Sequence, residues 1–488
     1  MKKFQVGYFF KYILLFCFSF LFTYIKFKNV NYTVLMGDDI IYLYDFVSNN
    51  SPLMILKNFG YVMAKYRPIY YLFMYLPVKF FGLHYQNYFL FNIVLFSVLS
   101  LVLYYVVYKI SNKVLYCILA VGLMIMTPFN AYSIMQVYGS MEILSLLIIS
   151  LIFLLCYQYY IGNATNKKCF LIFLLFFCSI FIAERNMCLA LAIIFTILIS
   201  QVKLLKKLFH CFIICMPLIL KHITTVISNS NMLQTGRGTV FELLNNVIAF
   251  SLKGFINIMG YSIGDEWHGG FKIYQISGII LLISTFIFIF VFSFITRYVS
   301  KNYKDLKTMI IFFVFFLINL LPYSLIALTH GEDRFLLTPY FILIIFLFYM
   351  ARNFSLKNKN ILVCICMLIA FKFIVDVYYN FNKDMIHFKY SQEIAQSVYE
   401  DVKKNINKNE NVDVVFFNCG DEYKWIFADK LFMKYYFGQN CDTYYFKTID
   451  EIPNNILEDI NTLFIVPDNN FDVPFKAKVI SKKEMTKL

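Results

Sequence analysis

Long apolar runs separated by short polar loops constrain the fold of this chain more than any other feature. A membrane span needs about 20 mostly apolar residues, and about eleven stretches meet that description, near residues 9–26, 88–108, 114–129, 141–160, 169–183, 187–201, 208–227, 273–296, 309–328, 335–351 and 361–379. Only 15% of the 488 residues are charged, against roughly 25% in soluble globular proteins. The sequence therefore predicts an α-helical polytopic membrane protein with about eleven transmembrane helices.

Basic residues predict the orientation of these helices. The first run begins with Lys2 and Lys3 and lacks a small-residue cleavage site, so we expect a retained span with a cytoplasmic N-terminus. Alternate loops are then cytoplasmic, and they carry Lys109, Lys113, Lys167, Lys168, Lys203, Lys206, Lys207, Arg297, Lys301, Lys304, Lys307, Arg352, Lys357 and Lys359. This distribution fits the positive-inside rule. It accounts for the net charge of +15 through topology, and no nucleic-acid partner is expected.

The last part of the chain differs from the rest in composition. Residues 1–380 hold the apolar runs, whereas residues 381–488 are polar. A helical stretch at 391–405 and strand-like runs at 412–417 and 462–466 predict a small soluble α/β domain. The loop alternation places this domain on the extracytoplasmic side.

Two cysteines, Cys419 and Cys441, belong to this predicted domain, and the other ten lie in or beside apolar runs. An oxidising compartment would permit a disulfide between the two, although spacing alone does not establish its geometry. We expect the bond and leave free thiols as the alternative.

Two adjacent acids, Asp38 and Asp39, follow the first predicted span. A carboxylate there can accept a proton from a hydroxyl group or bind a divalent cation. A solvated turn is the plainer alternative, because Gly37 precedes the pair. The same predicted outside loop holds Arg67, at the start of an apolar segment over residues 69–81 that we expect to lie on the membrane as an interfacial helix. Arg67 could bind a lipid phosphate or only anchor that helix.

Further ionisable residues flank later spans on the same predicted face. Glu184 and Arg185 separate two apolar runs, and Glu142 begins another. Ionisable residues at such places are costly and commonly functional, and the structural alternative is a mutual ion pair that caps two helices. Asp333 and Arg334 precede a late span, and Arg334 could hold a phosphate with its planar fork.

These motifs, in this order, resemble the GT-C class of membrane glycosyltransferases, and more narrowly the bacterial relatives of the membrane O-mannosyltransferases that carry TPR repeats. The matching segments are Asp38-Asp39, Tyr66-Arg67-Pro68, Asn92, Ala183-Glu184, and Asp333-Arg334-Phe335 followed by Pro339. The sequence departs from the family where Phe89 replaces a His, where Ala183 replaces a Lys, and in the lack of a TPR array.

The resemblance implies a GT-C-like transmembrane domain over residues 1–380. It implies an enzyme of a bacterial plasma membrane that moves a sugar from a polyprenyl-phosphate donor to a glycan, lipid or protein acceptor on the outer face. Asp39 is the expected base with Asp38 in reserve, either acid could bind a divalent metal, and Arg334, Arg67 and Arg185 would hold the donor phosphate. Glu184, Asp333 and Glu142 would support them.

Two other classes of membrane protein compete with this interpretation. A lipid-linked oligosaccharide flippase or a Wzy-like polymerase would also be rich in spans and aromatic residues, but neither normally carries a folded outside tail of this size. A transporter should show repeats or paired broken helices, which the sequence does not suggest.

Overall fold

The computed structural model describes most of the chain. The described residues are 2–28, 34–48, 51–52, 67–162, 164–227, 254, 258, 303–326, 333–355, 386–405, 412–419, 421–438, 441–459, 461–468 and 476–480.

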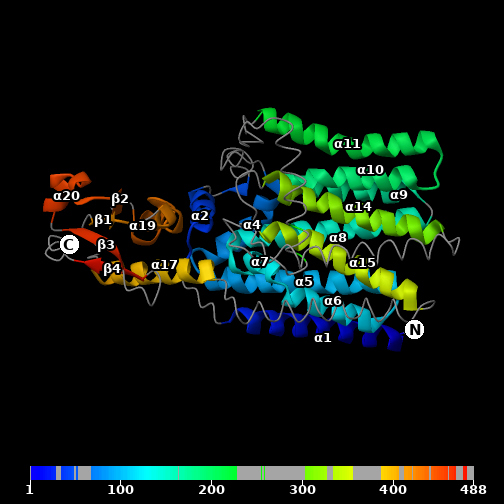
Figure 1. The fold of residues 1–488 in the computed structure, drawn as a ribbon, viewed down its shortest axis with the longest axis horizontal. Helices are drawn as coiled ribbons and strands as arrows, with labels where there is room; N and C mark the ends of the chain where they lie inside the picture. The colour runs from blue at the N-terminus through cyan, green and yellow to red at the C-terminus, as the bar shows by residue number, and fades with distance from the viewer. Residues whose placement is uncertain are drawn as a thin grey trace, which may run out of the picture.

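Long helices form a bundle over the first three quarters of the chain (Figure 1). Its described members are α1 (Lys2–Phe27), α5 (Tyr85–Ser111), α6 (Val114–Met126), α8 (Ser140–Ile161), α9 (Asn166–Ile182), α10 (Leu189–Ile199), α11 (Leu204–Ile227), α14 (Tyr303–Ile326) and α15 (Leu337–Ser355). Each overlaps one of the apolar runs predicted from the sequence. The predicted spans at 273–296 and 361–379 lie outside the described residues.

Four helical segments of the described chain are long and apolar enough to cross a membrane. They are Phe10–Phe27, Tyr85–Ser111, Val137–Ile161 and Arg334–Arg352. A fifth would be the pair Val114–Met126 and Pro128–Met135, which is bent by 64°. Several of the other predicted spans are short helices, and α10 with 11 residues extends only about 16 Å. The count of about eleven spans is therefore not confirmed.

Breaks in the bundle helices turn the chain back at one end. Pro128 cannot continue α6, and the hydroxyl of Thr127 accepts from the Phe129 N–H at 3.5 Å instead. The carbonyls freed at this break are paired: Lys26 Nζ donates to Thr127 O at 2.7 Å, and Asn130 Nδ2 donates to Ile125 O at 3.0 Å. Such pairing is required where the backbone has no water to bond.

Short elements gather at this end of the bundle. They are α2 (Asp38–Ser48), α4 (Pro68–Phe81), η2 (Pro128–Asn130), α7 (Ala131–Met135), η3 (Val137–Gly139), η4 (Glu184–Cys188) and η5 (Asp333–Leu336). In α4, Leu72, Leu76 and Phe80 are exposed by 41%, 57% and 76% and recur every four residues, while Tyr70 and Met74 on the opposite face are buried. This exposed apolar stripe fits the interfacial helix predicted over residues 69–81.

The C-terminal part contains a four-stranded sheet with helices. Its elements are α17 (Ile386–Asn405), β1 (Val412–Phe417), α18 (Asp421–Ile426), α19 (Leu431–Phe437), β2 (Cys441–Phe446), η6 (Ile449–Glu451), α20 (Asn454–Glu458), β3 (Thr462–Asp468) and β4 (Lys476–Ile480). The strand order is β2-β1-β3-β4, with β1 parallel to β2 and β3 and with β4 antiparallel to β3. The predicted helix and both predicted strands are present, whereas β2 and β4 were not predicted.

The disulfide predicted between Cys419 and Cys441 is wrong, because both residues are free thiols. The parallel register pairs Val412 with Cys441, so Cys441 lies where β1 begins. Cys419 follows the far end of β1, seven residues on, which is roughly 20 Å at the rise of an extended strand. Disulfide-bonded residues have Cα atoms less than about 7 Å apart.

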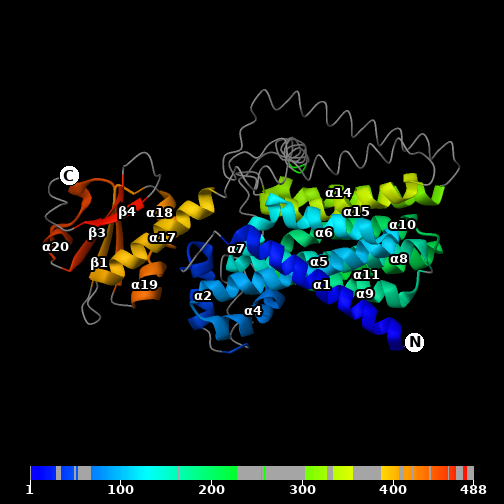
Figure 2. The same cartoon turned by 90° about the horizontal axis from the view of Figure 1, so that it is seen from below.

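The sheet lies at the end of the bundle opposite the N-terminus, and α2 lies between α19 and the bundle helices in both views (Figure 1 and Figure 2). The described parts of the predicted inside loops lie at the N-terminal end. There Lys206 Nζ donates to Ala164 O at 3.0 Å, and Arg352 donates to the carbonyl of Ile110.

Candidate functional site

The acidic pair begins α2, at the end of the bundle that faces the sheet. Asp39 is 2% exposed, and each of its carboxylate oxygens accepts a backbone N–H of η3, from Val137 at 3.0 Å and from Tyr138 at 3.1 Å. Burial raises the pKa of Asp39 well above its ordinary value, although the bond from Val137 opposes that change. Asp39 thus ties α2 to the start of α8. Asp38 is half-buried and more accessible than Asp39.

Tyrosine rings form one wall beside this pair. Tyr42 stacks on Tyr138 with centroids 4.1 Å apart, and Tyr70 meets the same ring edge-on at 5.3 Å. The hydroxyl of Tyr70 is 3.0 Å from Ser140 Oγ. These contacts join α2, η3, α4 and α8 into one packed unit.

The buried Arg67 forms an ion pair with the partly exposed Glu184 on this wall. Arg67 Nε donates to Glu184 Oε2 at 2.8 Å, and Lys221 Nζ lies 3.6 Å from Glu184 Oε1. The Arg67 guanidinium also lies 5.4 Å from the centre of the Tyr138 ring. Burial acts to raise the pKa of Glu184, but the charges of Arg67 and Lys221 outweigh it and hold that pKa below its ordinary value of 4.5.

Arg185 pairs with Glu142 at the start of α8. The neighbours Glu184 and Arg185 therefore each have a partner on another element, and the pair of Arg185 with Glu142 fits the structural alternative of an ion pair that caps helices. The Arg185 guanidinium also lies 4.8 Å from the centre of the Phe335 ring.

Arg334 lies against the same aromatic group. Its guanidinium carbon is 4.2 Å from the centre of the Tyr132 ring and 5.0 Å from that of Phe335. Arg185 and Arg334 thus share contact with Phe335, so their guanidinium carbons, 4.8 Å and 5.0 Å from the centre of that ring, are at most about 10 Å apart. Such a pair can hold an anion with bidentate hydrogen bonds.

Tyr42 shows that these groups surround one place. Burial raises its pKa to about 12, and four charges act on its hydroxyl in opposing directions: Arg67 and Arg334 lower the pKa, whereas Asp38 and Glu184 raise it. These charges come from segments up to about 300 residues apart in sequence. The structure therefore brings together most of the site residues predicted from the sequence.

Two further residues were singled out in the sequence, Asn92 and Asp333. Asn92 lies inside α5, where its amide donates to Gln136 O at 2.7 Å and to Ile134 O at 3.3 Å, so it supports the break before α8. Asp333 begins η5, but its side chain lies outside the described residues.

Sequence reasoning missed Tyr42, Tyr138 and Lys221. Tyr42 follows Asp38 and Asp39 by four and three residues, which places it on their side of a helix. Lys221 interrupts an apolar run, and an ionisable residue there is a recognisable signal.

Within the described part of the chain, no group of three or more His, Cys, Asp or Glu side chains could hold a metal ion. The prediction that Asp38 and Asp39 bind a divalent metal stays a prediction, with both oxygens of Asp39 already accepting backbone N–H groups.

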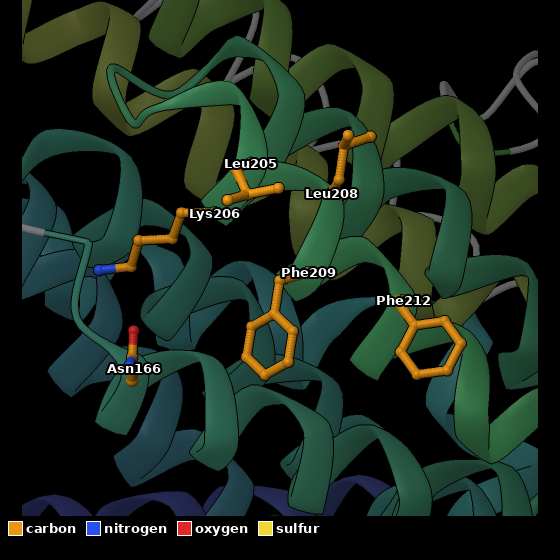
Figure 3. Close-up of a pocket in the computed structure, with 6 residues that line it drawn as sticks. All are labelled: Asn166, Leu205, Lys206, Leu208, Phe209 and Phe212. Carbon is orange, nitrogen blue, oxygen red and sulfur yellow. The ribbon is translucent and has the colours of Figure 1, made fainter.

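An open groove of about 660 Å³ lies elsewhere, beside the start of α11 (Figure 3). Its lining residues are Asn166, Leu205, Lys206, Leu208, Phe209 and Phe212. Because α9 and α11 both begin there, this groove is at the N-terminal end of the bundle. It lies away from α2 and α4, which are at the other end with the ionisable side chains described above (Figure 1). Its mostly apolar lining fits contact with lipid and offers no acid for chemistry.

Comparison with known proteins gave matches only among solved structures. No family model and no curated protein matches the chain. The apo oligosaccharyltransferase of Archaeoglobus fulgidus aligns with 12% identity and a TM-score of 0.45, over 89% of this chain and 64% of that one. The oligosaccharyltransferase AglB of the same organism, in complex with an inhibitory peptide and a dolichol-phosphate, aligns with 10% identity and a TM-score of 0.45, over 93% of this chain and 69% of that one.

Proposed function

We propose that this protein is a GT-C-type glycosyltransferase of a bacterial plasma membrane, which transfers a sugar from a polyprenyl-phosphate donor to an acceptor hydroxyl on the extracytoplasmic face. The observation that carries the proposal is the gathering of charged side chains beside the stacked rings of Tyr42 and Tyr138. Arg67 lies 5.4 Å from the Tyr138 ring and 2.8 Å from Glu184, and Asp38 begins the helix that carries Tyr42. Transfer from a phosphate-linked sugar needs a base for the acceptor and positive charge for the leaving phosphate, and this cluster supplies both.

Asp38 acts as the general base in this mechanism. It removes the proton of the acceptor hydroxyl as the acceptor oxygen attacks the anomeric carbon and the bond from that carbon to the phosphate oxygen breaks. Asp39 is the less suitable of the two acids, because both of its oxygens accept N–H groups of η3. We assign it the role of holding Asp38 in place.

The arginines differ in what they can offer the leaving phosphate. Arg334 and Arg185 lie against Phe335 and can share an anion between them. Arg67 is held by Glu184 at 2.8 Å, so it contributes its charge from a fixed position. The α4 stripe of Leu72, Leu76 and Phe80 would lie in the lipid surface, at the depth where the phosphate of a lipid donor is found.

The placement of α1 and of the sheet at opposite ends of the bundle supports the proposed topology (Figure 1). The predicted inside loops lie with the N-terminus, whereas the cluster and the sheet lie at the other end of the bundle (Figure 1). If the N-terminus is cytoplasmic, residues 381–488 form an extracytoplasmic domain beside the site.

The test is transfer by the purified protein in liposomes. Undecaprenyl-phosphate-linked mannose, glucose, galactose and N-acetylglucosamine, each radiolabelled, would be supplied with an envelope extract as acceptor, and released undecaprenyl phosphate and labelled product measured. We expect release with at least one donor and loss of release in Asp38→Asn. No release with any donor, together with accumulation of a complete lipid-linked repeat unit in cells lacking the protein, would favour the flippase or polymerase.

A further inference from the structure

The C-terminal part directly contacts the segment over residues 34–39, which holds Asp38 and Asp39. The hydroxyl of Tyr436 in α19 accepts from the Leu35 N–H at 2.6 Å. The carbonyl of Ile426 in α18 accepts from the Gly37 N–H at 2.8 Å. The backbone N–H groups of Leu35 and Gly37, within three residues of Asp38, are thereby bonded to residues 401 and 389 positions later in the chain.

The indole ring of Trp425 completes this contact at Gly37. Gly37 has φ of +54°, and a Cβ atom built there would lie 3.0 Å from Trp425 Cε2 and Cζ2. A residue other than glycine would therefore meet both backbone strain and the ring. The close approach of the ring and the bond to Ile426 fix the backbone where α2 begins.

The loop is held from both sides of Asp38. Val34, Leu35 and Met36 are 3% exposed or less, and the backbone N–H groups of Leu35 and Gly37 are bonded to the C-terminal part. On the other side, Asp39 is bonded to η3 of the bundle. Asp38 is the residue between these two fixed points.

We propose that α18 and α19 are a positioning element of the transferase site, in which Tyr436 and Trp425 set the place of the Asp38 carboxylate; this inference rests on the proposed function. A base must lie within hydrogen-bond reach of its proton, and misplacement by about 1 Å can cost roughly a hundredfold in rate. The C-terminal part is then a component of the active site as well as a domain beside it.

Tyr436→Phe tests this role with the smallest change. It removes the hydroxyl that accepts from Leu35 and keeps the ring. Tyr445→Phe is the matched control, because the Tyr445 hydroxyl also makes a hydrogen bond within the C-terminal part, to Asp429 O at 3.0 Å, but not to residues 34–39. Trp425→Ala and Trp425→Phe form a second pair, in which Phe should restore part of what Ala removes.

Two measurements on the full-length protein in liposomes test separately whether the contact holds residues 34–39 in place and whether it affects the rate of transfer. Hydrogen–deuterium exchange of peptides covering residues 34–43 should be about tenfold faster in Tyr436→Phe than in Tyr445→Phe. With undecaprenyl-phosphate sugar as the varied substrate, kcat should fall about tenfold in Tyr436→Phe, with KM for the donor changed less than twofold. A role in folding alone would lower the amount of active protein and leave the exchange of residues 34–43 unchanged in the folded fraction.

The outcomes distinguish this inference from the proposed function. Unchanged exchange in Tyr436→Phe would overturn the contact, whatever the activity. Faster exchange with wild-type kcat would overturn the positioning role. An inactive wild-type protein, with every donor tested, would overturn the proposed function and with it the positioning of a base, while the exchange data would still decide whether the contact exists.

Discussion

Substitutions at Asp39 should reveal how much of the site depends on its two backbone hydrogen bonds. Asp39→Asn retains one acceptor oxygen and replaces the other with an NH2 group, which faces a backbone N–H of η3. One N–H, of Val137 or Tyr138, is then left without an acceptor. Both residues are 5% exposed or less, so water cannot readily replace the lost acceptor.

The size of the effect follows from the number of unpaired donors. A buried donor left without a partner costs about 1–3 kcal/mol, so Asp39→Asn should lower the free energy of unfolding by about that amount. Relief of the buried charge acts in the opposite direction and favours the lower part of that range. Asp39→Ala leaves both donors unpaired, and its cost should be about twice as large.

The assay is unfolding of the purified protein in mixed micelles by titration with SDS, followed by circular dichroism, with transfer measured on the same samples. Asp38→Asn is the matched control: it should lower kcat by roughly a hundredfold, as expected for loss of a general base, with a smaller effect on stability than Asp39→Asn. If Asp39→Asn is as stable as the wild type and inactive, Asp39 is the base and the assignment of Asp38 fails. Equal stability of Asp39→Asn and Asp39→Ala would refute the argument that the loss of stability grows with the number of unpaired backbone N–H groups.

Four other outcomes can be checked on the same protein. Glu184→Gln should have a lower free energy of unfolding than the wild type at neutral pH. Because the pKa of Glu184 is lowered from 4.5 in the folded protein, this difference in stability should be present above pH 4.5 and disappear as the pH falls through the lowered pKa. Unfolding measured across a pH series checks this. Arg334→Lys keeps a charge but loses the planar fork, so KM for the donor should rise several-fold, whereas an unchanged KM would place the phosphate elsewhere. Gly139→Ala should destabilise the start of α8, because the added Cβ would lie 2.6 Å from Ser133 O, and a wild-type unfolding midpoint would contradict this. Alkylation of the denatured, unreduced protein followed by mass spectrometry should find Cys419 and Cys441 both labelled, and a peptide linked through them would contradict the strand register.

The bundle helices could be predicted from the sequence because their signal is local. An apolar run of sufficient length forms a helix in lipid whatever its neighbours, and each described helix of the bundle overlaps such a run. Helix length was harder to predict, since breaks such as those at Pro128 and Ala183 divide or shorten apolar runs. Strand β2 was missed because Cys441–Phe446 contains polar and aromatic residues without the continuous apolar pattern of β1.

The candidate site residues could be named from the sequence, but the residues that each of them contacts could not. The order of Asp38, Arg67, Glu184 and Arg334 in the sequence resembles that of a known family, and the structure brings them together around Tyr42. No sequence pattern indicates that Glu184 pairs with Arg67, 117 residues away, or that Asp39 bonds to η3. These contacts depend on how the helices pack, and the wrong disulfide has the same origin, because strand register cannot be derived from cysteine spacing.

The exposed stripe of α4 makes the bilayer a structural support for Arg67. Arg67 immediately precedes α4, and Leu72, Leu76 and Phe80 are exposed, so we expect acyl chains to cover them and the depth of α4 to follow the position of the lipid surface. A thinner or thicker bilayer would shift this surface relative to the bundle helices. The strain would reach the pair of Arg67 and Glu184, which joins α4 to the rest of the protein. We therefore expect membrane thickness to influence the geometry of the candidate site, whatever its ligand.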